Sequence, residues 1–242
     1  MTSIWHDTSA RPITDPSDEL PSRSDVIVAG AGIAGLTAAV LLSEAGLKVT
    51  LVEARTIAAL ATGNTTAKFS LLQGSQLSSV RAQRGHEIAA AYVEANRLGL
   101  DWAAAFCAEE GVGWQTRPAV NFATTRSGAR KVDEERAVAE ELGLRVETGG
   151  HHGLPFTVEN FFAAPGNGQL DPYELSIALV ARARRAGAKV VEGLTVTAAS
   201  QHKAHVEVQA TRAPNADLVS FSASHLILAT GFPVLDRGLH FA

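Results

Sequence analysis

The chain has 242 residues, a formal net charge of −4 and a hydrophobic content of 46%. That length is enough for one large domain or two smaller ones, and the composition supports a sizeable core. The slightly negative charge, without a basic run, argues against a nucleic-acid partner. No apolar stretch is long enough to span a membrane. Residues 1–24 lack the apolar core of a signal peptide, so we expect a cytoplasmic protein.

The first 24 residues are expected to form an irregular arm. Pro12, Pro16 and Pro21 disfavour regular structure there, and Trp5 is the large aromatic side chain of this segment. Because an exposed tryptophan is unusual, we expect Trp5 to dock on the body of the protein. Farther along, the single cysteine, Cys107, excludes an internal disulfide, and its helical surroundings favour a buried apolar role.

A strand, a glycine-rich turn, a helix and a second strand then follow in the order of a dinucleotide-binding unit. The short apolar run 26–29 is typical of a buried parallel strand. It leads into Gly30-Ala31-Gly32-Ile33-Ala34-Gly35, which is a G-x-G-x-x-G pattern. A helix is predicted from about 36 to 45, with Gly46 as its C-terminal cap. A strand over 48–52 ends on Glu53.

Each part of this unit has a physical role in binding a dinucleotide. Gly30 makes the tight turn, Gly32 lets the backbone approach a pyrophosphate, and Gly35 allows close packing of helix and sheet. The helix start offers unpaired N–H groups to phosphates. Glu53 can accept hydrogen bonds from ribose hydroxyls and would repel the 2′-phosphate of NADP. A unit that needs glycines only for packing would not explain this acid.

The segment that follows Glu53 is rich in small and hydroxyl residues. Residues 61–67, ATGNTTA, can pass close to a cofactor and donate hydroxyl and backbone hydrogen bonds to phosphate or sugar. A polar surface loop is the alternative interpretation. Lys68, the next residue, lies near the cofactor in the first interpretation and is solvated in the second.

The middle of the chain mixes helices and strands. A helix over 76–111 is predicted because small and apolar residues recur every three or four positions as a buried stripe: Ile88, Ala91, Ala95, Leu98, Trp102 and Ala105. In a strand over 114–125, Pro118 indicates an edge or a bulge. A charged helix over 130–144 and short strands over 144–147 and 161–164 follow. His151 and His152 have no cluster of further ligands around them, so no metal site is predicted.

The last third returns to alternating helix and strand. Asp171 is the predicted cap, and Pro172 the first-turn residue, of a helix over 174–186. A strand over 189–191 follows. Three strands, over 195–201, 205–211 and 218–224, are predicted to form an antiparallel meander. A final apolar strand over 225–231 ends in Ala-Thr-Gly, where it would meet a ligand at the carboxyl edge of the sheet.

The predicted fold class is therefore α/β. A Rossmann-like dinucleotide-binding domain, with a parallel sheet and an antiparallel meander, is interrupted by an inserted α+β subdomain. The arm covers 1–24, the binding domain covers 25–75 and 165–242, and the insertion covers 76–164. The binding domain is expected to hold the cofactor, and the insertion to cover a substrate face.

The sequence resembles the FAD-dependent oxidoreductases related to D-amino-acid oxidase, glycine oxidase and sarcosine oxidase. The matching motifs are DVIVAGAGIAGLTAA with LVEA, the ATGNTTAK loop, GQLDPYEL and LILATG, and they span nearly the whole chain. The SIWHDT start and the ATGNTTAKFS loop are further similar to a bacterial subgroup whose members usually carry a C-terminal Rieske [2Fe–2S] domain.

The resemblance implies FAD as the cofactor and a role for each matching position. Gly30, Gly32 and Gly35 would face the FAD pyrophosphate, and Ala31, Ile33 and Ala34 between them would also belong to the cofactor site. Glu53, Ala54 and Arg55 would surround the adenosine ribose. The backbone of Val196 would pair with adenine, while Thr230 and Gly231 would approach the FAD from the returning strand. The pyrophosphate and ribityl chain would be lined by Thr62, Gly63, Asn64, Thr65, Thr66, Ala67 and Lys68. No catalytic residue is implied.

The resemblance also implies that relatives continue well past the LILATG strand, with most substrate-gripping residues in that later part. A Rieske cluster needs two Cys and two His ligands, which one cysteine cannot supply. We therefore expect the amino-terminal part of an FAD-dependent oxidoreductase that moves a hydride from an amine or amino-acid C–H to flavin. Its partners would be a small-molecule substrate and an electron acceptor or a missing C-terminal half. A non-catalytic nucleotide-binding remnant and an NAD-dependent dehydrogenase are the alternatives.

Overall fold

The computed structural model describes residues 3–5, 19–149, 153–212, 215 and 217–231. The chain divides into two compact units, which are considered separately below. Unit 1 comprises Met1–Thr66 and Asp171–Ala242, and unit 2 comprises Ala67–Leu170.

Unit 1 is built on a mixed six-stranded sheet with the order β6-β2-β1-β9-β8-β7. The strand β1 (Arg23–Ala29) lies in the middle and pairs in parallel with β2 (Val49–Val52) on one side and β9 on the other. The strand β6 (Lys189–Val191) extends the parallel part, whereas β7 (Leu194–Gln201) and β8 (Val206–Arg212) add antiparallel neighbours. This arrangement confirms the predicted α/β fold class.

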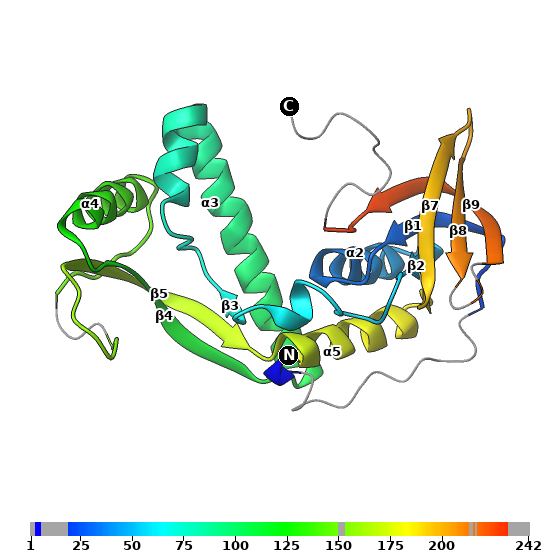
Figure 1. Ribbon diagram of the computed structural model, residues 1–242, viewed down its shortest axis with the longest axis horizontal. Coiled ribbons are helices and arrows are strands. Elements are labelled where there is room, and N and C mark those ends of the chain that lie inside the picture. The colour runs from blue at the N-terminus through cyan, green and yellow to red at the C-terminus, as the bar shows by residue number, and fades with distance from the viewer. Residues whose placement is uncertain (1–2, 6–18, 150–152, 213–214, 216, 232–242) are drawn as a thin grey trace. The chain divides into compact units, whose positions relative to one another are not determined.

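Two helices of unit 1, α2 (Ile33–Glu44) and α5 (Pro172–Arg185), lie against each other (Figure 1). The sequence predicts the start of α5 correctly. The Asp171 carboxylate accepts the N–H groups of Tyr173 and Glu174, at 2.8 and 3.2 Å, and Pro172 occupies the first turn. This cap satisfies amides that the helix itself leaves without acceptors.

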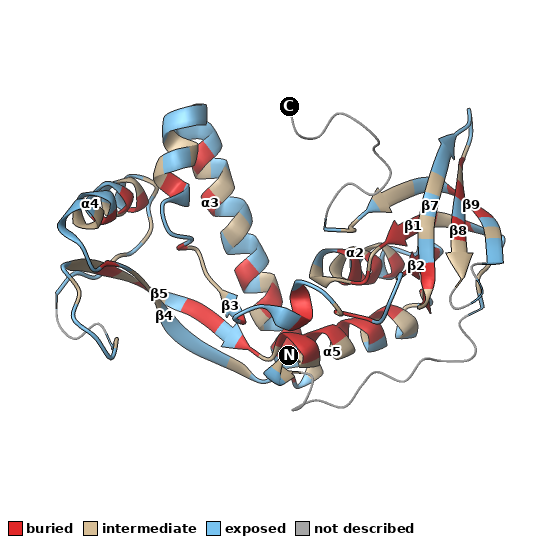
Figure 2. Cartoon of the chain, viewed as in Figure 1, coloured by how far each residue is buried: buried red, intermediate tan, exposed pale blue. Residues whose placement is uncertain are grey.

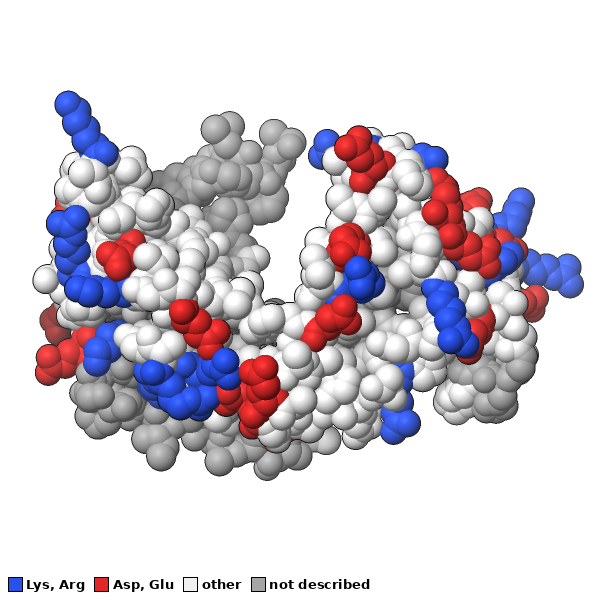
Figure 3. Space-filling view, turned by 180° about the vertical axis from the view of Figure 1, so that it is seen from behind, with Lys and Arg blue, Asp and Glu red and all other residues white. Residues whose placement is uncertain are grey.

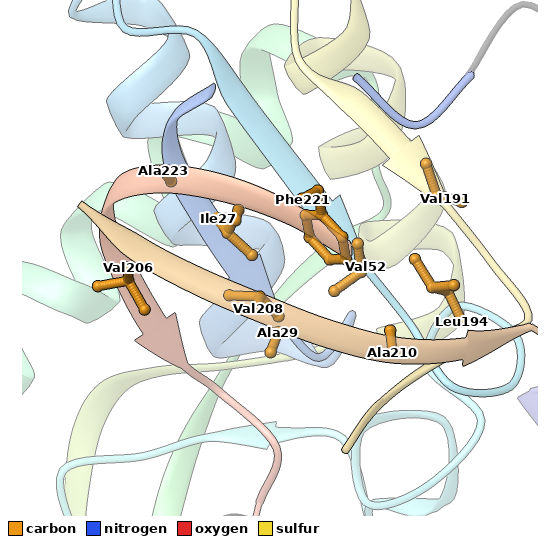
Figure 4. Packing of buried hydrophobic residues seen from close by; sticks show 10 residues of the cluster. All are labelled: Ile27, Ala29, Val52, Val191, Leu194, Val206, Val208, Ala210, Phe221 and Ala223. Atoms are coloured by element: carbon orange, nitrogen blue, oxygen red, sulfur yellow. The ribbon is translucent and has the colours of Figure 1, made fainter. Parts of the chain in front are cut away.

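The strands of unit 1 enclose an apolar cluster (Figure 4). Because side chains alternate along a strand, Ile27 and Ala29 of β1 reach the cluster, and β8 contributes every second residue to it. The cluster contains Ile27, Ala29, Val52, Val191, Leu194, Val206, Val208, Ala210, Phe221 and Ala223. Burial of these side chains stabilises the packing of the antiparallel strands with the parallel ones.

The third meander strand and the final strand, predicted as two elements, are one continuous strand, β9 (Asp217–Leu228). Its first half pairs with β8 as far as Ala223, and its second half pairs with β1 from Ser222 onward. The predicted break between 224 and 225 was wrong because the strand changes partner there without turning. No glycine or proline stands at that point.

Unit 2 contains a three-stranded antiparallel sheet with the order β3-β5-β4 and two helices. The strands are β3 (Lys68–Phe69), β4 (Trp114–Ala123) and β5 (Asn160–Leu170). The register of β4 against β5 shifts between Arg117 and Ala119, as Pro118 predicted. Figure 2 shows β4 as mostly exposed or partly buried, which agrees with its position at an edge.

The helix α3 (Gln76–Glu110) buries a different face from the predicted stripe. Ile88 and Leu98, expected inside, are 52% and 58% exposed. The buried positions of this helix are Leu77, Ala89, Val93, Leu100, Ala103, Phe106 and Cys107. Small and apolar residues follow helical spacing on both faces, so spacing alone could not select the packed one. The burial of Cys107 is confirmed.

Other boundaries in unit 2 also differ from the prediction. The helix α4 (Arg126–Glu141) begins four residues early, because the Thr125 hydroxyl accepts the Gly128 N–H at 3.2 Å and caps it there. The strand expected over 144–147 is only an isolated bridge between Glu147 and Ala163. Pairing of β3 with β5 places residues 67–75 and 165–170 in unit 2, so its borders lie outside the predicted 76–164.

Candidate functional site

The turn that leaves β1 is closed by neighbouring strands. The Gly30 N–H donates to the Val52 carbonyl at 2.8 Å, and the Ala229 N–H donates to the Ala29 carbonyl at 2.8 Å. Gly30 has φ +108°, and a Cβ there would lie 2.5 Å from the Ala229 carbonyl oxygen and 3.2 Å from the Thr230 Cα. Only glycine fits this position, because both the backbone angle and the space exclude a side chain.

The other two glycines of the fingerprint have different surroundings. A Cβ on Gly35 would lie 1.9 Å from the Gly30 carbonyl oxygen, so this glycine lets α2 begin directly against the turn. A Cβ on Gly32 would meet only the Thr62 hydroxyl, at 3.2 Å. The first contact explains packing, whereas the second leaves the backbone at Gly32 open to approach, as expected for a position facing a ligand.

Glu53 connects β2 with the glycine-rich turn. Its backbone continues the sheet, donating to the Val191 carbonyl at 2.9 Å and accepting from the Leu194 N–H at 2.8 Å. Its carboxylate accepts the Ala31 N–H at Oε2 and the Arg55 N–H at Oε1, at 2.8 and 2.9 Å. Each carboxylate oxygen has two acceptor positions, so the oriented group retains capacity for further donors.

Thr62 caps the start of α2 across the loop. The Ile33 N–H donates to the Thr62 hydroxyl oxygen at 3.0 Å, and Thr62 is 9% exposed. The expectation that the helix start offers unpaired N–H groups therefore needs correction at this amide. Within the described part of the chain, the amides of Gly32, Ala34 and Gly35 have no acceptor, so an anion-binding helix terminus remains.

The rest of the predicted loop is used largely for its own structure. The short helix η1 (Thr62–Asn64) buries Gly63, whose N–H donates to the Ala58 carbonyl at 2.9 Å. The Asn64 amide donates to the Leu60 carbonyl at 2.7 Å. The Thr65 carbonyl accepts the indole N–H of Trp5 at 2.9 Å, which confirms that Trp5 docks on the body.

The remaining predicted residues of this region lie at the surface or in unit 2. Ala54, Arg55 and Thr66 are exposed. Ala67 belongs to unit 2, has φ +64° and is buried, and its carbonyl accepts the Leu170 N–H at 3.3 Å. Lys68 is exposed in β3, opposite Gln169. The cofactor roles of Ala67 and Lys68 stay predictions.

Val196 lies in the antiparallel part of the sheet of unit 1, whereas Thr230 and Gly231 lie just beyond the end of the returning strand β9. Val196 is half-buried in β7, the edge strand, opposite Ala210. The Leu194 N–H turns away from β8 to reach Glu53, and strand alternation directs the Val196 amide the same way. Thr230 is half-buried beside the Gly30 turn, and Gly231 follows it with φ +78°.

One residue of this region was missed by the sequence analysis. The Glu192 carboxylate accepts the Ile57 N–H at 2.6 Å and so reaches the loop that follows Glu53. A signal was available in the sequence: β6 ends in Val-Val and is followed by Glu192, as β2 ends in Leu-Val and is followed by Glu53. The two strands are parallel neighbours, so both acids lie at the same edge of the sheet.

Among the described residues, metal-ligating side chains give no competing site. Figure 3 shows acidic and basic side chains interspersed on the face it displays. Among the described residues, no three His, Cys, Asp or Glu side chains gather as a metal site, and His151 and His152 lie outside that part of the chain. No helix among the described residues combines the length and apolar character needed to cross a membrane.

Comparison with known proteins assigns the chain to a family. The family model "FAD dependent oxidoreductase" matches residues 25–239. The chain belongs to this family of FAD-dependent oxidoreductases. FAD is therefore the cofactor of this family, and the matched region includes the glycine-rich turn, Glu53 and the returning strand.

The relatives compared below are distant from this chain in sequence. A putative Rieske 2Fe-2S iron-sulfur protein of Bacillus subtilis (strain 168), YhfW, is 23% identical over 179 residues, covering 73% of this chain and 35% of the relative. L-Amino acid deaminase from Proteus myxofaciens has a similar fold, with a TM-score of 0.66 and 19% identity, over 87% of this chain and 46% of that one.

Two further solved structures share this fold. L-Proline dehydrogenase from P. horikoshii has a TM-score of 0.66 and 18% identity, over 87% of this chain and 54% of its own. Glycine oxidase from Geobacillus kaustophilus has a TM-score of 0.63 and 17% identity, with coverages of 86% and 55%. The chain thus spans about half the length of the similar solved structures and 35% of the curated relative.

Proposed function

We propose that the chain binds FAD along the carboxyl edge of the sheet in unit 1. The pyrophosphate would accept hydrogen bonds from the amides of Gly32, Ala34 and Gly35, where the α2 dipole favours a negative group. The Glu53 carboxylate would accept hydrogen bonds from the adenosine ribose. The dinucleotide would run past Thr230 and Gly231 at the end of β9.

The hydrogen bond from the Ala31 N–H to Glu53 Oε2, at 2.8 Å, is the observation that carries this proposal. It joins the acid to the fingerprint turn, so phosphate donors and a ribose acceptor lie beside each other. A βαβ unit that needed glycine for packing alone would have no reason to hold a carboxylate there with capacity to spare. The same carboxylate disfavours the 2′-phosphate of NADP.

Adenine would meet the edge of β7. The direction of the Leu194 N–H indicates that the backbone of Val196 faces away from β8, where an adenine edge can exchange hydrogen bonds with it. The neighbouring exposed residues Ala54 and Arg55 would flank the ribose. These assignments give each end of the adenosine a partner within unit 1.

The proposed chemistry is oxidation of an amine or amino acid. Loss of a hydride from the carbon beside nitrogen, and of a proton from nitrogen, leaves an imine and transfers two electrons to the hydride acceptor. Bound FAD supplies that two-electron acceptor. The similar folds include an L-amino acid deaminase, an L-proline dehydrogenase and a glycine oxidase, which supports amino acids as the substrate class.

A flavin titration tests the proposal directly. The chain is incubated with FAD, gel-filtered, and examined for flavin absorbance and quenched flavin fluorescence; we expect one FAD per chain. Gly32→Val should abolish binding, because its side chain would occupy the open face of the turn, while Gly99→Ala, in the interior of α3, should leave it intact. NADH is titrated in parallel. Tight NADH binding without FAD binding would refute the proposal in favour of a nicotinamide-dependent dehydrogenase.

Activity requires a separate measurement. The FAD-loaded chain is mixed with L-proline, glycine or L-phenylalanine under anaerobic conditions, and bleaching of the flavin spectrum is followed. Bleaching by any of these amino acids is the expected result. Stable FAD binding without bleaching by any of these three amino acids would support a non-catalytic nucleotide-binding role instead.

A further inference from the structure

The loop between β2 and η1 is held on both sides. On one side, the Ala58 N–H donates to the Ala31 carbonyl of the fingerprint turn at 3.0 Å. On the other side, the Gly193 N–H donates to the Arg55 carbonyl at 3.2 Å, next to Glu192. Ala58 has φ +57°, a conformation that an alanine adopts only when its surroundings enforce it.

Glu192 supplies a charged side chain that reaches this loop. Its Oε1 accepts the Ile57 N–H at 2.6 Å, and Ile57 itself is 1% exposed. If this bond were lost, the N–H of the buried Ile57 would be left without an acceptor. The bond therefore fixes the backbone one residue before the strained Ala58 and two residues after Arg55, whose N–H orients Glu53.

We propose that Glu192 is a positioning residue for the ribose-binding acid. Its carboxylate holds residues 54–58 in place, and that loop holds the Glu53 carboxylate through the Arg55 N–H. This inference rests on the proposed adenosine site. Two glutamates at the ends of neighbouring strands thus have separate tasks: Glu53 binds the ribose, and Glu192 orients Glu53 through the backbone.

The test compares ADP with 2′,3′-dideoxy-ADP, which lacks both ribose hydroxyls. Dissociation constants of the full chain are measured by isothermal titration calorimetry. We expect ADP to bind wild type at least tenfold more tightly, because hydroxyls bonded to a charged group are lost in the analogue. Glu53→Gln should lower this ratio. A role confined to stability would change both affinities together and leave the ratio unchanged.

Variants at Glu192 separate the effect of side-chain length on the affinity ratio from the effect of charge. Glu192→Leu should reduce the ratio to below about threefold, and Glu192→Asp, which keeps the charge but is one methylene too short, should do the same. Glu192→Gln keeps an acceptor oxygen and should preserve the ratio within about twofold. The exposed Glu19 provides the control variant Glu19→Leu. Circular dichroism checks folding, and if the leucine variant is unfolded, Glu192→Asp decides.

The possible outcomes distinguish this inference from the proposed function. A wild-type ratio near one, or a ratio that survives Glu53→Gln, overturns the ribose site and the positioning role together. A tenfold ratio that falls with Glu53→Gln but persists in folded Glu192→Leu and Glu192→Asp overturns the positioning role alone. Loss of the ratio in both Glu192 variants, with rescue by Glu192→Gln, supports it.

Discussion

The acid Glu135 provides a quantitative test of how unit 2 is held together. Its side chain on α4 is fully buried, and its two carboxylate oxygens accept the N–H groups of Leu77 and Ser78, at 2.9 and 2.8 Å. Those amides lie in the first turn of α3, where the helix supplies no acceptors of its own. One carboxylate therefore caps a helix from a different element.

The cost of removing this cap follows from the two bonds. Hydrogen bonds to charged groups contribute about 1.5–3 kcal/mol each, and loss of an ordinary N-cap costs about 0.5–2 kcal/mol. We expect Glu135→Ala to lower the free energy of unfolding by about 3 kcal/mol. Glu135→Gln retains one acceptor oxygen, so it should cost less, about 1–2 kcal/mol.

Urea unfolding followed by circular dichroism measures both variants. Hydrogen exchange at the Leu77 and Ser78 amides locates the change, because these two N–H groups lose their acceptor. The adjacent, exposed Glu134 gives the matched control, and Glu134→Ala should stay within about 0.5 kcal/mol of wild type. If Glu135→Ala behaved like Glu134→Ala, the buried carboxylate would not support α3.

Three further predictions follow from local geometry. Gly35→Ala would place a methyl group 1.9 Å from the Gly30 carbonyl oxygen, so thermal melts of this variant should show no folded protein. A melt like that of wild type would contradict the turn geometry. Ala58→Val should cost about 2 kcal/mol in urea unfolding while Ala58→Gly stays within about 1 kcal/mol, because φ +57° strains a β-branched side chain more than alanine and does not strain glycine; equal stabilities of the two variants would refute this strain. Hydrogen bonds from Arg81, and next from His86, lower the pKa of Glu141 from its usual value of 4.5. The ionised carboxylate therefore stabilises the folded protein above pH 4.5, and this contribution disappears as the pH falls through the lowered pKa. The difference in melting temperature between wild type and Glu141→Gln should therefore shrink from pH 7 to pH 3, and a constant difference would exclude the ion pair as its cause.

The sequence predicted those parts of the fold that depend on nearby residues. The G-x-G-x-x-G turn, the cap at Asp171 and the bulge at Pro118 each arise from a steric or hydrogen-bonding rule that acts within a few positions. The proximity of Glu53 to the turn was also predictable, because parallel neighbouring strands bring their carboxyl ends together.

The errors arose where distant contacts decide between local alternatives. Ile88 and Leu98 satisfy helical spacing as well as Val93 and Leu100 do, and only the packing partners of α3 select the buried face. The role of Thr62 as a cap for Ile33 joins residues 29 positions apart, and Glu192 reaches Ile57 across 135 positions. No short sequence window contains both members of such a pair.

The central position of β1 has a kinetic consequence. One neighbour, β2, emerges about twenty residues later, but the other, β9, pairs Val26 with His225 and so becomes available only after about two hundred more residues are synthesised. At typical translation rates of about 5–20 residues per second, an early strand would wait ten seconds or longer with one side unpaired. Such a delay exposes the nascent chain to aggregation and makes it a natural client for chaperones.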